Sequence, residues 1–384
     1  MNYANRFLVT YLLITLMMSG LSQAFGNDGA YTTSGNQLIP IVETDISVVK
    51  EVLSIVRDEY NIMHITVEYQ FFNPGQDKTI MVGFEAVSPS GDVDATPING
   101  EHPYIKDFRV LMNGSRLWYG TSIVADSFYI DHDTIAGMPL EEILKNDNSN
   151  YVDFNYVYFF TAHFKQGLNT LKHTYSFKSS NSVEFIYDLE YILTAANRWA
   201  NGQIDDFTLN IDMGDFENFY LNQTFFDSTD HWGVNGFYKF QHDPAHPIFE
   251  DPAAVFVVKD GPVTFHKKNF HPKGELFLYS MVDYFAVSMQ EFDIHGDVLI
   301  PYSLTMSQLI DECANAESYQ VLRNLPYALR GYHFKTDYIQ EYYERQHWYR
   351  EDPKYTASLE SITEDERKWL ISIKSKWEAK NAKE

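Results

Sequence analysis

This 384-residue chain has a single cysteine and few basic residues relative to its acidic ones. Cys313 is the only cysteine, which excludes an internal disulfide. Lys and Arg total 29 against 53 Asp and Glu, a formal net charge of −24. So acidic a protein is repelled by phosphate backbones and anionic lipid surfaces. We therefore expect no nucleic-acid partner.

Long hydrophobic runs are also lacking, apart from one short run near the start. Residues 7–18 are apolar, Arg6 is the only charged residue in residues 1–26, and small residues follow at Ser22, Ala24 and Gly26. The run is short for a transmembrane helix and suits a secretory signal, with an uncleaved anchor as the alternative. No cysteine ends the run, so a lipid-modified N-terminus is not expected. The pattern predicts a signal peptide over residues 1–26, a periplasmic or extracellular destination, and no stable membrane insertion after cleavage.

Familiar catalytic and cofactor signatures are missing. The chain contains no G-x-S-x-G elbow, no H-E-x-x-H pair, no G-x-G-x-x-G fingerprint and no P-loop. His242 and His246 have metal-ligand spacing, but their segment contains two prolines and lacks the glutamate of a zinc-protease helix. His266 and His271 could extend them to a four-histidine cluster, although loop histidines more often have other partners. We expect no metal, no cofactor and no assignable catalytic residue.

What the chain does contain, over residues 27–300, is the pattern of β-strands. In "HITVEYQFF", Ile65, Val67, Tyr69 and Phe71 alternate with polar residues, the period-two pattern of a half-buried strand. Asn113-Gly114 is the pair that a type I′ hairpin turn prefers. Further segments of this kind recur without helical patterns between them. This predicts a mainly β body, an antiparallel β-sandwich of one or two units.

The pattern changes to helical periodicity near residue 301. Thr305 and Gln308 resemble a capping box, and the helix that would follow places Cys313 on a buried stripe. There a cysteine behaves as a small hydrophobic residue rather than a reactive thiol. We therefore predict a small helical module over residues 301–384.

Three later signals support the module. Pro326 fits the first turn of a helix that begins near Asn324, and Gly331 stands where such a helix would end in a left-handed conformation. Thr336 can cap the next helix. Thr363 and Glu366 form another capping-box start.

The module resembles a known family. The residues that carry the likeness are Tyr327, Ala328, Gly331, Tyr332, Phe334, Lys335, Tyr342, Tyr343, Gln346, Trp348 and Tyr349. Their spacing, over about residues 305–375, resembles the YARHG domain of exported bacterial proteins. The chain departs from the signature Tyr-Ala-Arg-His-Gly at Leu329 and Arg330. Segments 27–40 and 191–214 more weakly resemble a bacterial exported β-rich domain of unknown function. The resemblance implies export and a two-part architecture, with no settled activity.

Aromatic residues are the candidates for a binding role. Trp118, Tyr119, Trp199, Trp232 and Trp348 could stack on sugar rings or anchor a protein, or else fill the core. The same choice between core and binding applies to the module residues Tyr327, Gly331, Phe334, Tyr342, Trp348 and Tyr349. We expect an exported, non-catalytic binding protein for a cell-wall component, a glycan or a protein. The alternative is a hydrolase of an envelope polymer with paired carboxylates in the β region.

Overall fold

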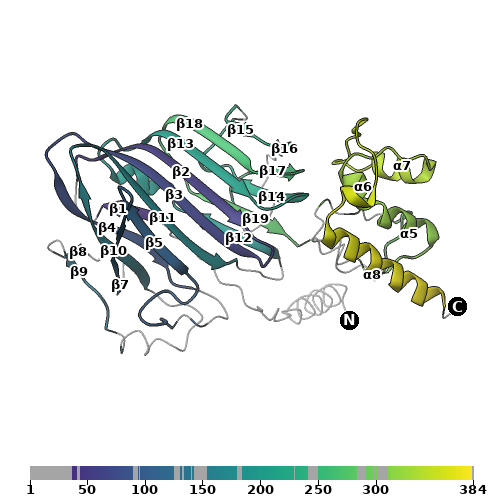
Figure 1. Ribbon diagram of the computed structural model, residues 1–384, viewed down its shortest axis with the longest axis horizontal. Coiled ribbons are helices and arrows are strands. Elements are labelled where there is room, and N and C mark those ends of the chain that lie inside the picture. Colours follow the sequence, from purple (N-terminus) through teal and green to yellow (C-terminus); the bar gives the residue numbers. More distant parts are fainter. Residues whose placement is uncertain are drawn as a thin grey trace, which may run out of the picture.

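A computed structural model describes residues 37–40, 44–89, 94, 96–124, 130–131, 134–139, 141, 154–179, 184–228, 230–240, 250–282, 291–296, 300, 302, 310 and 312–382. These residues form a β-sheet body followed by a cluster of helices (Figure 1). The mainly β fold with a C-terminal α module is therefore confirmed. The predicted signal peptide, His242 and His246 lie outside the described residues, and the predicted limits of the domains stay a prediction.

The largest sheet has eight strands and forms one layer of the body. Its order is β15-β18-β13-β2-β3-β11-β5-β6. All its pairings are antiparallel except that of β13 with β2, which is parallel. In chain order its strands are β2 (Ser47–Arg57), β3 (Ile62–Asn73), β5 (Lys106–Met112), β6 (Ser115–Leu117), β11 (Gly167–Lys178), β13 (Ile204–Asp212), β15 (Trp232–Gly233) and β18 (Val263–Phe270).

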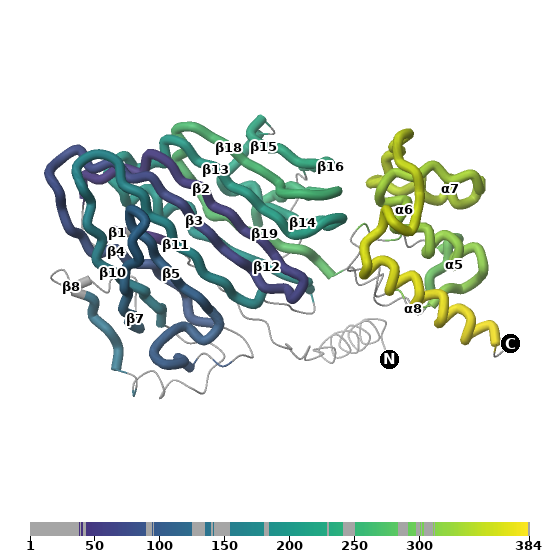
Figure 2. The backbone as a smooth tube through the Cα atoms, viewed as in Figure 1, coloured from purple at the N-terminus to yellow at the C-terminus, as the bar shows by residue number. Residues whose placement is uncertain are grey.

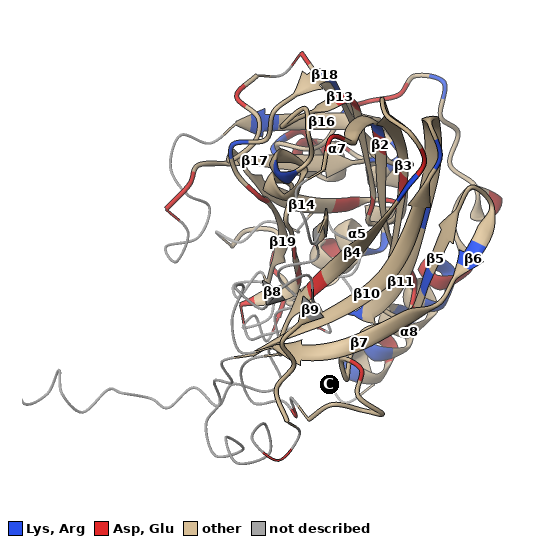
Figure 3. Cartoon of the chain, turned by 90° about the vertical axis from the view of Figure 1, so that its left-hand side faces the viewer, with Lys and Arg blue, Asp and Glu red and all other residues tan. Residues whose placement is uncertain are grey.

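Two smaller sheets cover the inner face of the large one. One has the order β1-β4-β10-β7 and the other β12-β19-β14-β17-β16. Figure 3 shows β2, β3 and β11 on one side of the body and β14, β17 and β19 on the other. The strands are β1 (Gln37–Pro40), β4 (Lys78–Val87), β7 (Tyr119–Val124), β10 (Asn155–Phe164), β12 (Phe185–Tyr191), β14 (Glu217–Asn222), β16 (Gly236–Phe240), β17 (Ala253–Val258) and β19 (Leu276–Met281), with a separate pair β8 (Ile130–Asp131) and β9 (Thr134–Ile135).

The core of the body lies between these layers. On β3 the predicted inward set, Ile65, Val67, Tyr69 and Phe71, is buried, while the residues between them face outward. One continuous cluster of buried side chains joins all three sheets. In β3, two-residue periodicity therefore sorts the side chains into a core face and a solvent face, whereas β4 and β17 are buried on both faces over most of their length.

The module consists of α5 (Ala316–Arg323), α6 (Leu325–Leu329), α7 (Asp337–Glu344) and α8 (Glu364–Asn381). Single-turn helices lie at η1 (Thr194–Arg198) in the body and η2 (Leu359–Ser361) before α8. Asn315 caps α5, and Thr363 with Glu366 forms the predicted capping box of α8. Figure 2 follows the chain through these helices beside the end of the body at β14 and β16. In the described part of the chain, no helix has both the length and the apolar character needed to cross a membrane.

The helix predicted to reach Cys313 is wrong at that end. Cys313 is not helical and pairs with Phe292 in a parallel bridge, while residues 303–309 lie outside the described part. The helix starts later because the Asn315 side chain accepts a hydrogen bond from the Ser318 amide. Cys313 is nevertheless buried as predicted, and burial raises its pKa to about 12, which keeps the thiol protonated.

Candidate functional site

The solvent face of the large sheet carries a polar surface at its centre. Glu68 and Gln70 of β3 and Thr170 of β11 are exposed, and Lys172 of β11 is half-buried. The residues between them, such as Tyr69 and Leu171, are buried in the core. Alternation within each strand therefore builds this surface.

The strand register aligns these side chains in two rows across the sheet. One row runs from Lys50 through Gln70 to Thr170. The next runs from Val52 through Glu68 and Lys172 to Leu111. Directly opposed residues on one face have neighbouring side chains. Residues that are far apart in the chain therefore meet on one surface.

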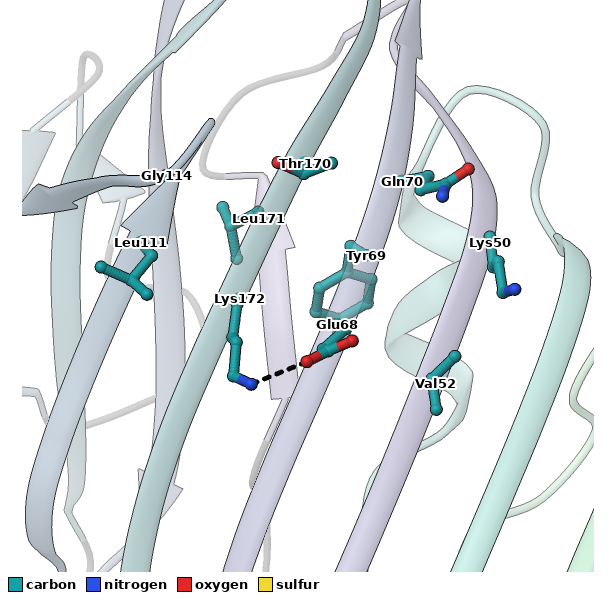
Figure 4. A pocket seen from close by; sticks show the side chains of 10 residues that line it. All are labelled: Lys50, Val52, Glu68, Tyr69, Gln70, Leu111, Gly114, Thr170, Leu171 and Lys172. Atoms are coloured by element: carbon teal, nitrogen blue, oxygen red, sulfur yellow. Dashed lines mark hydrogen bonds and ion pairs between the residues drawn. The ribbon is translucent and has the colours of Figure 1, made fainter.

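A pocket of about 350 Å³ lies over these rows (Figure 4). Its wall includes Gly114 of the β5–β6 turn, where Asn113 and Gly114 have φ of 49° and 80° as the predicted type I′ turn requires. Lys172 Nζ lies 2.7 Å from Glu68 Oε1, so this pair is neutral in sum. The pocket thus offers amide, hydroxyl, ammonium and carboxylate groups for hydrogen bonding.

Trp118 lies at the edge of the same face. Arg116 is paired with Leu111 of the pocket wall, and its guanidinium carbon lies 5.1 Å from the centroid of the Trp118 ring. The Trp118 side chain is 82% exposed. Of the five aromatic residues considered for stacking, Trp199 and Trp348 are buried and Tyr119 and Trp232 are half-buried. Trp118 is therefore the one of the five that is free to contact a ligand with most of its ring.

Two further apolar side chains are exposed beyond the Gln70 row. Phe72 and Leu168 are paired across β3 and β11, and they are 42% and 66% exposed. They lie two residues along their strands from Gln70 and Thr170, hence on the same face. The surface is thus a pocket lined by both polar and apolar side chains, with two further apolar side chains beyond it.

The six module residues proposed from the sequence are brought together around α6 and α7. Phe334, Tyr342, Trp348 and Tyr349 are buried, as is Gly331, whereas Tyr327 is half-buried. Tyr343 joins them, with ring centroids 5.2 Å from Phe334, 5.9 Å from Trp348 and 5.9 Å from Tyr349. This packing is that of a core, and it favours the structural role of these residues over an exposed platform.

Gly331 has two reasons to be glycine. It follows α6 with φ of +80°, a left-handed conformation that side chains disfavour. A Cβ atom there would lie 2.4 Å from the Arg350 carbonyl oxygen, while the Asp352 amide donates to the Gly331 carbonyl at 2.8 Å. The turn and the later segment therefore lie in direct backbone contact.

Arg330, which departs from the family signature, has a defined structural role. Its guanidinium donates two hydrogen bonds to the fully buried Glu366, at 2.6 and 2.8 Å. The same group lies 4.6 Å from the centroid of the Phe216 ring in the body. Arg330 therefore connects α6, α8 and the β-sheet body, which the sequence pattern did not reveal.

Metal binding gains no support from the histidines that the structure describes. His266 lies 3.0 Å from Asp206, and the His271 side chain contacts the Gly202 carbonyl. The described residues contain no group of three or more His, Cys, Asp or Glu side chains arranged to hold a metal ion.

Three carboxyl groups in the described part of the body are buried, those of Glu51, Glu85 and Glu217, and they bear on the hydrolase alternative. Glu51 faces the core, and burial raises its pKa to about 8, whereas Glu217 lies 2.9 Å from the Arg57 guanidinium. None of the three lines the pocket of Figure 4. The polar surface is therefore separate from these groups.

Comparison with known proteins identifies the module. Residues 297–376 match the YARHG domain family, which confirms the resemblance at the C-terminal end. YARHG domains occur in exported proteins. A search of curated proteins found no match.

Solved structures provide only remote likenesses. A candidate nutrient binding protein from Legionella pneumophila has 17% identity and a TM-score of 0.44, over 90% of this chain and 99% of that one. An M1 zinc metallopeptidase from Deinococcus radiodurans has 8% identity and a TM-score of 0.27, over 62% of this chain and 43% of that one. Baculovirus P35 has 10% identity and a TM-score of 0.27, over 62% of this chain and 98% of that one. Likenesses this remote carry no functional assignment.

Proposed function

We propose that this protein is an exported, non-catalytic binding protein that recognises a glycan on the solvent face of its large sheet. The observation that supports this is the position of Trp118, which is 82% exposed at the edge of a face whose central pocket offers both polar and apolar side chains. The proposal places the protein in the periplasm or outside the cell, in line with the YARHG match.

Sugar chemistry fits both parts of this surface. A pyranose ring has apolar C–H faces and a rim of hydroxyl groups. An exposed indole offers a flat apolar surface on which the C–H face of the sugar can stack. The sugar hydroxyl groups can form hydrogen bonds with donors and acceptors of the pocket, which are Gln70, Thr170 and the Glu68–Lys172 pair. Trp118 is thus a stacking platform and the pocket a set of hydroxyl contacts.

The charge pattern argues against anionic polymers as the main ligand. Lys50, Lys172 and Glu68 line the pocket together, and the whole chain carries a net charge of −24. A neutral or weakly charged glycan avoids the repulsion that this net charge imposes on polyanions. Among wall components, the sugar strands are therefore preferred to phosphate-rich polymers.

Co-sedimentation of the purified protein with insoluble cell-wall glycan tests the proposal. We expect the wild-type protein to bind and Trp118→Ala to bind roughly tenfold more weakly, as loss of an aromatic contact of about 1.5 kcal/mol implies. Trp118→Phe should keep part of the binding because a smaller ring remains. Gln70→Ala should weaken binding without removing the platform.

Tyr60→Ala is the matched control. Tyr60 is 73% exposed in the turn between β2 and β3, so its loss also removes a surface aromatic ring. We expect its binding to equal that of the wild type. Wild-type protein that remains wholly in the supernatant, or equal losses in the two alanine variants, would contradict a glycan site at Trp118.

A further inference from the structure

A second pocket, separate from the large sheet's outer face, lies where the body meets the module. Its volume is about 290 Å³, and its walls come from the β16–β17 end of the body and from α6 and residues 348–352 of the module. Ligand pockets commonly lie at such junctions, and this size is near the lower end of the usual ~300–1,000 Å³. It suits a single small molecule rather than a polymer.

One part of the wall is aromatic. Phe237, Tyr302 and Trp348 line the pocket, and the Tyr302 and Trp348 ring centroids are 5.4 Å apart. Tyr302 donates its hydroxyl hydrogen bond to the Val258 carbonyl at 2.8 Å, so its ring is held in place. Trp348 is 4% exposed, and among the described residues its indole Nε1 has no acceptor.

The cationic side chains that line the pocket differ in whether they already have an ion-pair partner. Arg330 is matched by the carboxylate of Glu366. Lys259 and Arg350 form no ion pair with any described residue. Arg350 donates to the carbonyls of His347 and Tyr349 and lies 5.2 Å from the Phe237 ring centroid, which leaves its positive charge unbalanced.

Anions line the same pocket. The Glu351 side chain contacts His333 at 3.1 Å, and the Asp352 carboxylate accepts from the Lys354 amide at 2.9 Å. Neither interaction involves Arg350 or Lys259. The wall therefore presents positive and negative groups to one small volume, beside an apolar surface.

We propose that this junction pocket binds a free amino acid with an apolar side chain. Its carboxylate would pair with Lys259 and Arg350, its ammonium with Glu351 or Asp352, and its side chain would lie against Phe237, Tyr302 and Trp348. A ligand with one charge only would leave one set of groups unmatched, which is why the zwitterion is preferred. This site does not depend on glycan binding at Trp118.

Isothermal titration of the full-length mature protein with L-phenylalanine tests the proposal. We expect binding, and roughly tenfold or greater weakening with phenylalanine amide, which lacks the carboxylate, and with N-acetylphenylalanine, which lacks the ammonium. Glycine, which lacks the apolar group, should also bind more weakly. Absence of phenylalanine binding, or equal affinity for the amide and the free acid, would overturn the assignment.

Variants connect the binding to this pocket. Lys259→Met and Arg350→Met should each weaken phenylalanine binding roughly tenfold or more. Lys239→Met is the matched control, because Lys239 is exposed on β16 and does not line the pocket.

Two outcomes separate this site from the glycan site. Trp118→Ala should leave phenylalanine binding unchanged. If both pocket variants bind phenylalanine as well as the wild type does, the amino-acid site is elsewhere and the proposal fails, whatever the result with glycan.

Discussion

Gly331 shows how one residue determines the path of the module. Its left-handed φ and the contact with the Arg350 carbonyl both exclude a side chain. Gly114 has the same φ of +80° but has no atom within 4 Å of the position that a Cβ would take. The two glycines therefore separate the conformational cost of alanine from the steric cost.

We predict that Gly331→Ala destabilises the protein more than Gly114→Ala. The left-handed conformation alone costs about 1–2 kcal/mol, and the clash at Gly331 adds to it. Urea unfolding followed by circular dichroism measures both variants. Equal losses at the two positions would show that the Arg350–Asp352 segment moves away without cost.

A second residue-scale prediction concerns pH. Burial raises the pKa of Glu51 to about 8, above its ordinary value of 4.5, so the folded state holds this proton more tightly. The stability that Glu51 contributes is complete below pH 4.5 and is lost as the pH rises toward 8. Glu51→Gln, which stays neutral, should therefore gain stability over the wild type between these values, by a few kcal/mol at pH 8.5.

The histidines of the core act in the opposite direction and do not confuse this test. Burial lowers the pKa of His173 to about 3 and of His102 to about 4, so their contribution is complete above pH 6.5 and is lost in acid. Both histidines are present in the wild type and in Glu51→Gln, so their contributions cancel in the difference in stability between the two proteins. Thermal melts from pH 4.5 to 8.5 measure it, with exposed Glu59→Gln as control. A difference that does not change with pH would show that Glu51 is ionised in the folded protein.

At the scale of elements, the Arg330–Glu366 pair joins α6 to α8. We predict that Arg330→Met costs about 3–5 kcal/mol, because it leaves the buried Glu366 carboxylate without a partner. Adding Glu366→Gln should recover part of this loss, since it removes the unpaired charge and keeps a side chain suited to the capping box. Guanidinium unfolding of the two single variants and the double variant gives the coupling energy.

A surface pair provides the comparison. Lys368 and Asp365 lie 2.9 Å apart on α8, with side chains 67% and 71% exposed. Lys368→Met should leave the stability almost unchanged, because solvent screens an exposed ion pair. If the effects of Arg330→Met and Glu366→Gln simply add, the buried pair does not join the helices in the way proposed.

Local patterns predicted those elements whose cause is local. The alternation in β3, the Asn113-Gly114 turn, the capping box at Thr363 and the left-handed Gly331 all follow from neighbouring residues. The helix extended to Cys313 was wrong because its spacing of buried residues also suits an irregular segment that pairs with Phe292. The same limit applies to the site: periodicity showed that Glu68 and Gln70 face outward, but only strand order brings Lys50 and Thr170 beside them.

At the scale of the whole molecule, the module packs against the body through residues distant in sequence. Phe216 and Val257 of the body belong to the same buried cluster as Trp348 and Tyr342 of the module. No local pattern connects them, which is why the junction could not be predicted. The body therefore supports the module, and the two should respond together to changes at Phe216.

We predict that Phe216→Ala increases amide hydrogen exchange in α6 and α7, although it lies in neither helix. Removal of a buried ring creates a cavity at the junction and costs about 3–5 kcal/mol. Hydrogen exchange followed by mass spectrometry locates the effect. Phe72→Ala, on the exposed face of β3, should leave the module unchanged; protection of α6 and α7 that is the same in both variants would mean that the module is stable without this contact.

The parallel pairing of β2 with β13 has a consequence for how the chain folds. Arg57 at the end of β2 contacts the Met213 carbonyl, 156 residues further along. Closing so long a loop slows folding, because its entropy is lost before the pairing forms. Until residues 204–212 arrive, β2 is paired only with β3 and has one open edge. Until then this open edge can pair with another chain, and its exposure ends only when β13 is in place.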